Sequence, residues 1–234
     1  MNNKNLFSIL CIFSLLFFGC NPKVQVLLNT QNEISYDATI PFDSQLQETF
    51  SSFFPTTEET FINPSHLEEL LNNSKTSQNS VTFTDNILHL KGTLLQPLQA
   101  LNSTLFDITK AENHTKLAIT LFPEIIQERL FSAPQEIQDV CEMLMIPLYT
   151  EEKLTKEEYL EQIAGLYGKN FAKNLQKSEI AFTFTAPNTL EQVSLYPKTL
   201  GIYKIQQNSV TFFIPLTHFI TNTEKIEFCI QWKN

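Results

Sequence analysis

The chain has 234 residues, is 42% hydrophobic, and carries 25 acidic against 16 basic side chains, for a formal net charge of −9. This length suits one globular domain or two small ones, and the apolar content is ample for a packed core. Arg129 is the only arginine. The acidic balance argues against a nucleic-acid-binding surface and against attachment to anionic lipid through a polybasic patch.

An apolar stretch opens the chain and ends at a glycine and a cysteine. Lys4 supplies a positive charge, and Leu6 to Phe18 contains no charge at all. This run is shorter than the 20 or so residues that cross a bilayer core as a helix. A basic start, a short apolar run and a small residue before a break are typical of a secretory signal. Residues 1–19 are therefore predicted to be a signal peptide.

The tetrad Phe17-Phe18-Gly19-Cys20 resembles the lipobox of bacterial lipoproteins, in a relaxed form similar to that of spirochaetes. The resemblance implies cleavage between Gly19 and Cys20 and a diacylglycerol on the Cys20 thiol. Phe17 and Phe18 depart from the leucine and the small residue that the family prefers. The alternative is an ordinary cleaved signal with an unrelated cysteine. The lipobox implies a bacterial cell-envelope protein, lipid-anchored to a membrane and either periplasmic-facing or surface-exposed.

A strand pattern begins directly after the predicted lipidated cysteine and its tether, residues 20–23. Residues 24–29 and 33–40 are predicted to form a hairpin. The tether spans about 10 Å at about 3.5 Å per residue, so we expect the domain to sit against the membrane. A lipidated cysteine that leads straight into β-hairpins with interspersed helices also resembles the layout of LppM-type lipoproteins.

Two helices are predicted to follow this hairpin. Asp43 suits the N-cap of the first helix. In the second, Pro64 suits the first turn and Ser65-x-x-Glu68 matches a capping box. The polar stretch over residues 72–80 predicts a loop.

The middle of the chain alternates further strands and helices. Residues 81–95 predict a strand or a hairpin that turns at Asp85-Asn86, and residues 98–105 predict a short helix. A second hairpin is expected over residues 105–122, with its turn at Glu112-Asn113.

Three helical segments follow. One begins at Pro123 and another covers residues 135–145. The third opens with a capping box, Thr155-x-x-Glu158. Gly165 and Gly168 weaken it by about 1 kcal/mol each relative to alanine, so a kink or break is expected there.

The C-terminal part is rich in strands. A strand that ends at a proline and leads into a helix recurs, as in TFFIPLTHFI. This order predicts one α+β ectodomain over residues 24–234, with antiparallel β-hairpins and several helices packed on one face. The four strands predicted here are residues 179–186, 200–206, 209–216 and 225–232.

The sequence contains no local catalytic, metal or cofactor motif. Glycine occurs five times, and no phosphate-binding G-x-G-x-x-G, Walker A or G-x-S-x-G pattern is present. The histidines, His66, His89, His114 and His218, lack zinc-site spacing. We expect no metal, no cofactor and no catalysis, although a non-local serine–histidine site of an envelope hydrolase stays open as an alternative.

Two cysteines remain after signal removal and lipidation. Cys141 lies in a helix-like stretch and Cys229 in a strand-like one, each among apolar neighbours. Export permits a disulfide between them, and two buried free thiols are the alternative.

Phenylalanine is abundant, with 20 residues in the chain. Adjacent pairs put one ring on each side of a strand or span a wide helical arc. The rings fill the core in one interpretation and line a hydrophobic-ligand patch in the other. The candidate patch consists of Phe53, Phe54, Phe212 and Phe213.

These patterns together predict a membrane-anchored envelope lipoprotein with a non-catalytic binding or structural role. The expected partners are the membrane, through the N-terminal lipid, and a protein or lipid, with no nucleic acid. A carrier of lipid or another hydrophobic ligand with a phenylalanine-lined groove is one alternative. The hydrolase is the other.

Overall fold

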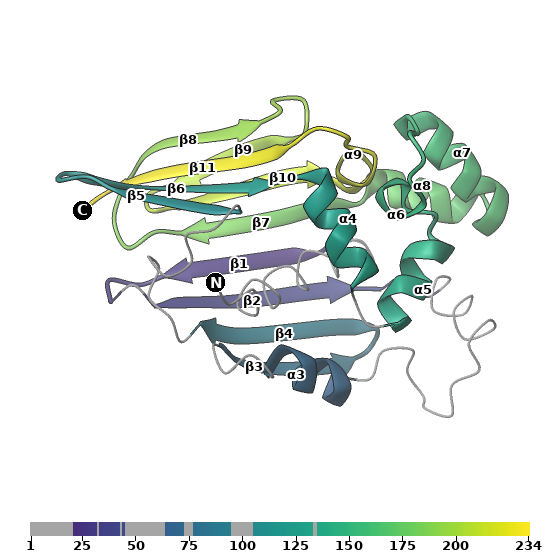
Figure 1. Cartoon of the computed structure of the whole chain (residues 1–234), viewed down its shortest axis with the longest axis horizontal. Coiled ribbons are helices and arrows are strands. Elements are labelled where there is room, and N and C mark those ends of the chain that lie inside the picture. The colour runs from purple at the N-terminus through teal and green to yellow at the C-terminus, as the bar shows by residue number, and fades with distance from the viewer. Residues whose placement is uncertain are drawn as a thin grey trace.

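The protein is an α+β structure of two β-sheets and a group of helices, as the sequence predicted (Figure 1). In this computed structural model the described residues are 21–31, 33–42, 44, 64–72, 77–94, 105–132 and 135–234. The helix predicted from Asp43 and most of the helix predicted for residues 98–105 lie outside them.

The secondary structure of the described residues follows in chain order. The strands are β1 (Lys23–Leu28), β2 (Ile34–Pro41), β3 (Ser77–Thr84), β4 (Ile87–Leu94), β5 (Phe106–Lys110), β6 (His114–Leu121), β7 (Glu179–Thr185), β8 (Leu190–Tyr196), β9 (Ile202–Gln206), β10 (Ser209–Pro215) and β11 (Ile226–Lys233). The helices are α3 (Pro64–Asn72), α4 (Pro123–Phe131), α5 (Gln135–Met143), α6 (Pro147–Thr150), α7 (Lys156–Tyr167), α8 (Lys169–Lys177) and α9 (Leu216–Ile220).

Within the described residues, seven strands form the larger sheet in the order β3-β4-β2-β1-β7-β10-β9. The predicted hairpin of β1 and β2 is present, and neighbouring strands are antiparallel except for β1 and β7, which are parallel. The first strand of the chain therefore lies in the middle of the sheet, between β2 and a strand that begins at Glu179.

The hairpin of β3 and β4 turns at Asp85 and Asn86, as predicted. Both have positive φ, 53° and 62°, the backbone of a type I′ turn, which Asp and Asn tolerate better than most residues. β3 begins at Ser77 and α3 ends at Asn72, so the loop predicted over residues 72–80 is wrong at Asn72 and for its last four residues. The last four residues are polar, which an edge strand such as β3 tolerates, and a polar run gives no strand pattern in the sequence.

A buried polar cluster attaches α3 to this edge. The Asn79 side chain donates to the Leu71 carbonyl (3.0 Å) and accepts from the Tyr36 hydroxyl, while its backbone N–H donates to Asn72 Oδ1 (2.8 Å). Gly92 leaves the space for this cluster, because a β-carbon there would overlap Asn79 and the Tyr36 ring.

The predicted capping box at Ser65-x-x-Glu68 is wrong. α3 begins at Pro64, so Ser65 already lies inside the helix. The Glu68 carboxylate instead accepts a hydrogen bond from the Val81 backbone N–H, 3.0 Å away on β3. Glu68 thus ties the helix to the sheet.

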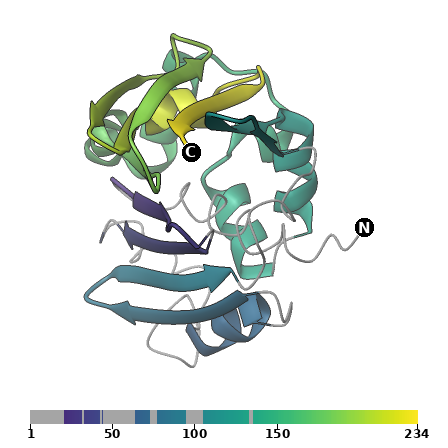
Figure 2. The same cartoon turned by 90° about the vertical axis from the view of Figure 1, so that its left-hand side faces the viewer.

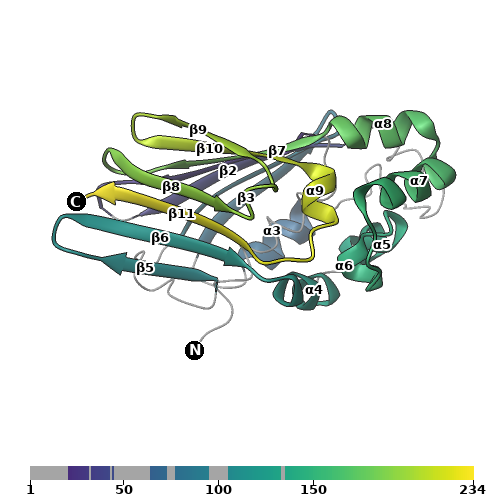
Figure 3. The same ribbon diagram turned by 90° about the horizontal axis from the view of Figure 1, so that it is seen from above.

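The smaller sheet, four strands of the described residues in the order β5-β6-β11-β8, stacks against the β7-β10-β9 part of the larger sheet (Figure 3). The predicted hairpin of β5 and β6 is present. Aromatic rings of both sheets meet between them: Phe228 of β11 lies 5.5 Å from Phe182 and 5.0 Å from Phe212, between ring centroids. β8 was not predicted, because only Val193 and Leu195 of this strand are buried.

Helices α4 to α8 gather at the end of the larger sheet where β1 and β7 begin, here called the helical end (Figure 1). Figure 2 shows helices and the smaller sheet on the same side of the larger sheet. The capping box of α7 is confirmed: Glu158 N–H donates to Thr155 Oγ1 (3.3 Å) and Thr155 N–H to Glu158 Oε2 (2.8 Å). Gly168 has φ 88° and separates α7 from α8, so the predicted break is confirmed.

We expect Gly92→Ala to lower the free energy of unfolding by about 1–3 kcal/mol, because the added methyl group forces apart the Asn79–Tyr36 contact. Gly165→Ala is the matched control: apart from its chain neighbours and the adjacent helix backbone, no atom lies within 4 Å of the new β-carbon. This variant should therefore stabilise α7 by about 0.5–1 kcal/mol. Urea unfolding of both variants measures the two changes in the free energy of unfolding. Changes of the same sign in the two variants would contradict the packing described around Gly92.

Candidate functional site

The N-terminus enters the fold at the helical end. The Asn21 side-chain oxygen accepts from the Glu179 N–H (3.1 Å), and the Pro22 carbonyl accepts from the Ala181 N–H (2.9 Å). Lys23 already belongs to β1, so the residues predicted as a tether are held against β7. Gly19 and Cys20 lie outside the described residues.

The described residues contain no helix that is both long enough and apolar enough to span a bilayer.

The larger sheet exposes one face, here called the outer face, which points away from the core. Buried residues occupy every second position of β2, β7 and β10, so the others point outward. Hydroxyl groups meet across this face: Thr183 Oγ1 lies 3.0 Å from Thr211 Oγ1, and Thr185 Oγ1 lies 2.9 Å from Ser209 Oγ. The outer face is therefore rich in hydrogen-bonding groups.

A groove of about 520 Å³ crosses the outer face over β1, β2, β4 and β3. Leu27 is 46% exposed in it and is surrounded by polar side chains. An apolar contact inside a polar rim is the usual anatomy of a protein-binding surface. The outward-pointing residues of this outer-face groove are Gln25, Leu27, Ser35, Asp37, Gln78, Ser80, Lys91 and Thr93.

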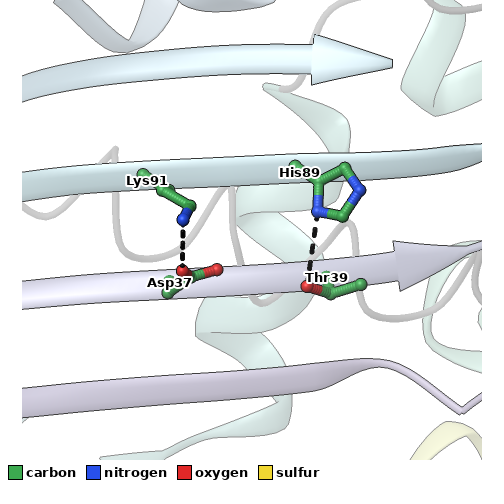
Figure 4. A network of polar contacts seen from close by, with 4 residues as sticks. All are labelled: Asp37, Thr39, His89 and Lys91. Carbon is green, nitrogen blue, oxygen red and sulfur yellow. Dashed lines mark hydrogen bonds and ion pairs between the residues drawn. The ribbon is translucent and has the colours of Figure 1, made fainter. Parts of the chain in front are cut away.

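Two polar pairs join β2 to β4 on the outer face (Figure 4). Lys91 Nζ lies 3.0 Å from Asp37 Oδ2, with 65% and 43% of the two side chains exposed. Such an exposed pair contributes at most about 1 kcal/mol to stability, so both charges remain available to a partner. Thr39 Oγ1 lies 3.5 Å from His89 Nδ1, beyond the 2.6–3.2 Å or so of a working general base.

A second groove, also about 520 Å³, lies at the helical end between α4, α6 and the segment after α9. The acidic residues that line this groove are Glu124, Glu151 and Glu152. The side-chain amide of Gln127 donates a hydrogen bond to Glu151 Oε1 (3.2 Å). Across the described residues, no three His, Cys, Asp or Glu side chains come together as a metal site requires. Glu158 does not line this groove but belongs to the capping box of α7. Hydrogen bonds from the backbone and side chain of Thr155 lower the pKa of its carboxyl group.

The structure separates the candidate phenylalanines. Phe212 points inward and is fully buried, with ring contacts to Phe182, Phe228 and Tyr203. Phe213 points outward, with Lys204 Nζ 5.2 Å from its ring centroid. The two residues therefore do not share a ligand patch, and the assignment of Phe212 to one is wrong because its ring fills the core. Phe53 and Phe54 lie outside the described residues.

Cys141 and Cys229 are both buried and free. Of the two alternatives, a disulfide or two buried free thiols, the structure has the second. Burial raises the pKa of the Cys141 thiol to about 12.

The outer-face groove was not recognised in the sequence. The outer face as a whole has a signal, the alternation of hydroxyl side chains with large apolar ones, as in Thr183-Phe184-Thr185 of β7. Strand pairing is needed to bring residues of β1 to β4 together, and no local pattern encodes that pairing.

Comparisons of the chain with protein-family models, with curated proteins and with solved structures each gave no match.

We predict that a thiol reagent at about pH 8 reacts slowly with Cys141 and Cys229 in the native protein and rapidly with both after unfolding without reductant. The reactive species is the thiolate, which burial suppresses at Cys141. Cys141→Ala should leave one of these two thiols after unfolding. A disulfide between them in the wild type would leave neither to react.

Proposed function

We propose that this chain is a bacterial lipoprotein, anchored in a membrane of the cell envelope by a diacylglycerol on Cys20. It has a non-catalytic binding role, carried by the outer face of the larger sheet. The observation that supports the anchor best is the sequence FFGC at the end of the apolar run. Signal cleavage before Cys20 leaves 215 residues that contain the complete described fold.

The path of the N-terminus fits this anchor. Asn21, the residue after Cys20, is bonded to Glu179 at the surface of the helical end. An acylated Cys20 would hold that end at the membrane, because consecutive Cα atoms are only about 3.8 Å apart. The anchor then sets the orientation of the whole domain.

The outer-face groove is accessible in this orientation. Along β1, Lys23 lies nearest to the anchor and Leu27 lies four residues further, about 13 Å at the rise of a strand. A partner can reach Leu27, Asp37 and Lys91 while the helical end stays at the membrane. This arrangement favours a protein partner that inserts an apolar side chain against Leu27 and pairs with the two charges.

The two alternatives have less support. A carrier with a phenylalanine-lined groove could not use Phe212 to bind its ligand, because this ring is buried in the core. For the hydrolase, the His89 contact to the Thr39 hydroxyl is long, and Asp37, a carboxylate on the same face, is paired with Lys91.

We expect the protein, expressed in a bacterium with labelled palmitate, to incorporate the label at Cys20. Cys20→Ser should abolish incorporation, because the thiol is the acyl acceptor. Cys11→Ser is the matched control and should keep full labelling, because Cys11 leaves with the signal. Mass spectrometry should show a mature chain that starts at Cys20. An unlabelled wild-type protein would refute the anchor.

A photoreactive amino acid at Leu27 should yield a discrete cross-linked partner in intact cells. The same group at Ile205 is the control, since Ile205 is similarly exposed but lies on the edge strand β9. Adding Lys91→Glu to the Leu27 probe should weaken the adduct, with less than about 0.5 kcal/mol effect on stability. Equal adducts at both positions, or none at Leu27, would contradict binding through the outer-face groove.

A further inference from the structure

Three lysines of α8 lie on one side of this helix. Lys169, Lys173 and Lys177 are spaced four residues apart in KNFAKNLQK, which aligns them along the helix surface. All three are exposed, whereas the apolar residues of α8 are buried. These lysines are here called the basic face.

The charges of the basic face are not neutralised within the protein. α8 contains no acidic residue. The neighbouring helix α7 carries Glu157, Glu158 and Glu161. Among the described residues, however, no carboxylate lies within ion-pair distance of the three lysines.

This arrangement does not serve the stability of the helix. Lysines four residues apart repel each other, and Lys169 lies in the first turn, where the helix dipole disfavours a cation. Of the three, Lys177 is in the last turn, where the dipole favours one. Neutral polar residues in place of Lys169 and Lys173 would leave the helix equally stable or more stable. A local departure from what folding favours indicates a function, and three exposed cations in a row match an anionic ligand.

The position of the basic face identifies that ligand. α8 ends at Lys177, and Glu179, two residues later, donates its N–H to Asn21 (3.1 Å). The basic face therefore adjoins the residue that follows Cys20. Leu166, at the end of α7 beside the start of α8, is 57% exposed. Lysines with an exposed apolar side chain at an anchored end are typical of a surface that lies on a membrane.

We propose that the basic face binds the anionic headgroups of the lipids in the membrane that holds the anchor. This inference rests on the proposed lipid on Cys20. The acyl chains attach the protein, and the lysines orient it, with α8 on the membrane surface. Helices α4 and α6, which border the second groove with its Glu124, Glu151 and Glu152, lie on the other side of the helical end from α8 (Figure 3). Charges more than about 10 Å away are screened at moderate salt, so an acidic protein can still present a local basic contact.

Lysine labelling on vesicles tests the proposal. The full chain, purified from membranes and checked by mass for acylation, is reconstituted into phosphatidylcholine vesicles with or without phosphatidylglycerol. An amine-acetylating reagent should modify the basic face about fivefold more slowly on the anionic vesicles, equivalent to about 1 kcal/mol per lysine. High salt should remove the difference. The reference lysines at the opposite end of the strands, Lys110, Lys116 and Lys233, should react equally on both.

Matched charge variants provide a second measurement. The test variant combines Lys169→Gln, Lys173→Gln and Lys177→Gln, and the control removes the three reference lysines in the same way. In a mixture of anionic and neutral vesicles, the wild type and the control should prefer the anionic ones by about 100-fold. The test variant should lose that preference.

The outcomes separate the two proposals. Acylated protein with equal labelling on both vesicles would overturn the docking and leave the anchor intact. Protein without the acyl mass would overturn both. Equal loss of preference in the two variants would show that net charge, not the basic face, determines binding, and would also overturn the docking.

Discussion

The packing of aromatic rings between the two sheets is the contact on which the rest of the structure depends. Phe212 lies at its centre, with ring contacts to Phe182, Phe228 and Tyr203, and each such pair contributes about 0.5–1.5 kcal/mol beyond the area that it buries. The Tyr203 hydroxyl also donates to the Val193 carbonyl (3.0 Å), which joins the edge strands of the two sheets. This packing orients β7 and β10, on which β1 and the helical end are built.

The same packing supports placing the proposed binding role at the surface of this protein. A strand presents its side chains alternately to its two faces. Once Phe182 and Phe184 of β7 point into the core, Thr183 and Thr185 must point outward. The interior between the sheets is occupied by rings, so a partner meets the hydroxyl groups of the outer face or the charged side chains of the helical end.

Local patterns were predictable from the sequence, and long-range pairing was not. The Asp85-Asn86 turn, the Thr155 capping box and the break at Gly168 each depend on a few adjacent residues. The parallel pairing of β1 with β7 joins distant segments, and β8 buries too few residues to show alternation. The lysines of α8 were overlooked because the negative total charge hides a local cluster. The acylation of Cys20 stays a prediction.

The central position of β1 has a consequence for the order of folding. Asn21 and Glu179, which are bonded at the start of the parallel pair, are 158 residues apart. β1 can pair with β2 as soon as the hairpin is made, but its other edge stays open until β7 has been synthesised. Closing so long a loop slows folding, and an open strand edge invites pairing with other chains. The N-terminal hairpin therefore needs protection from aggregation until β7 has been synthesised.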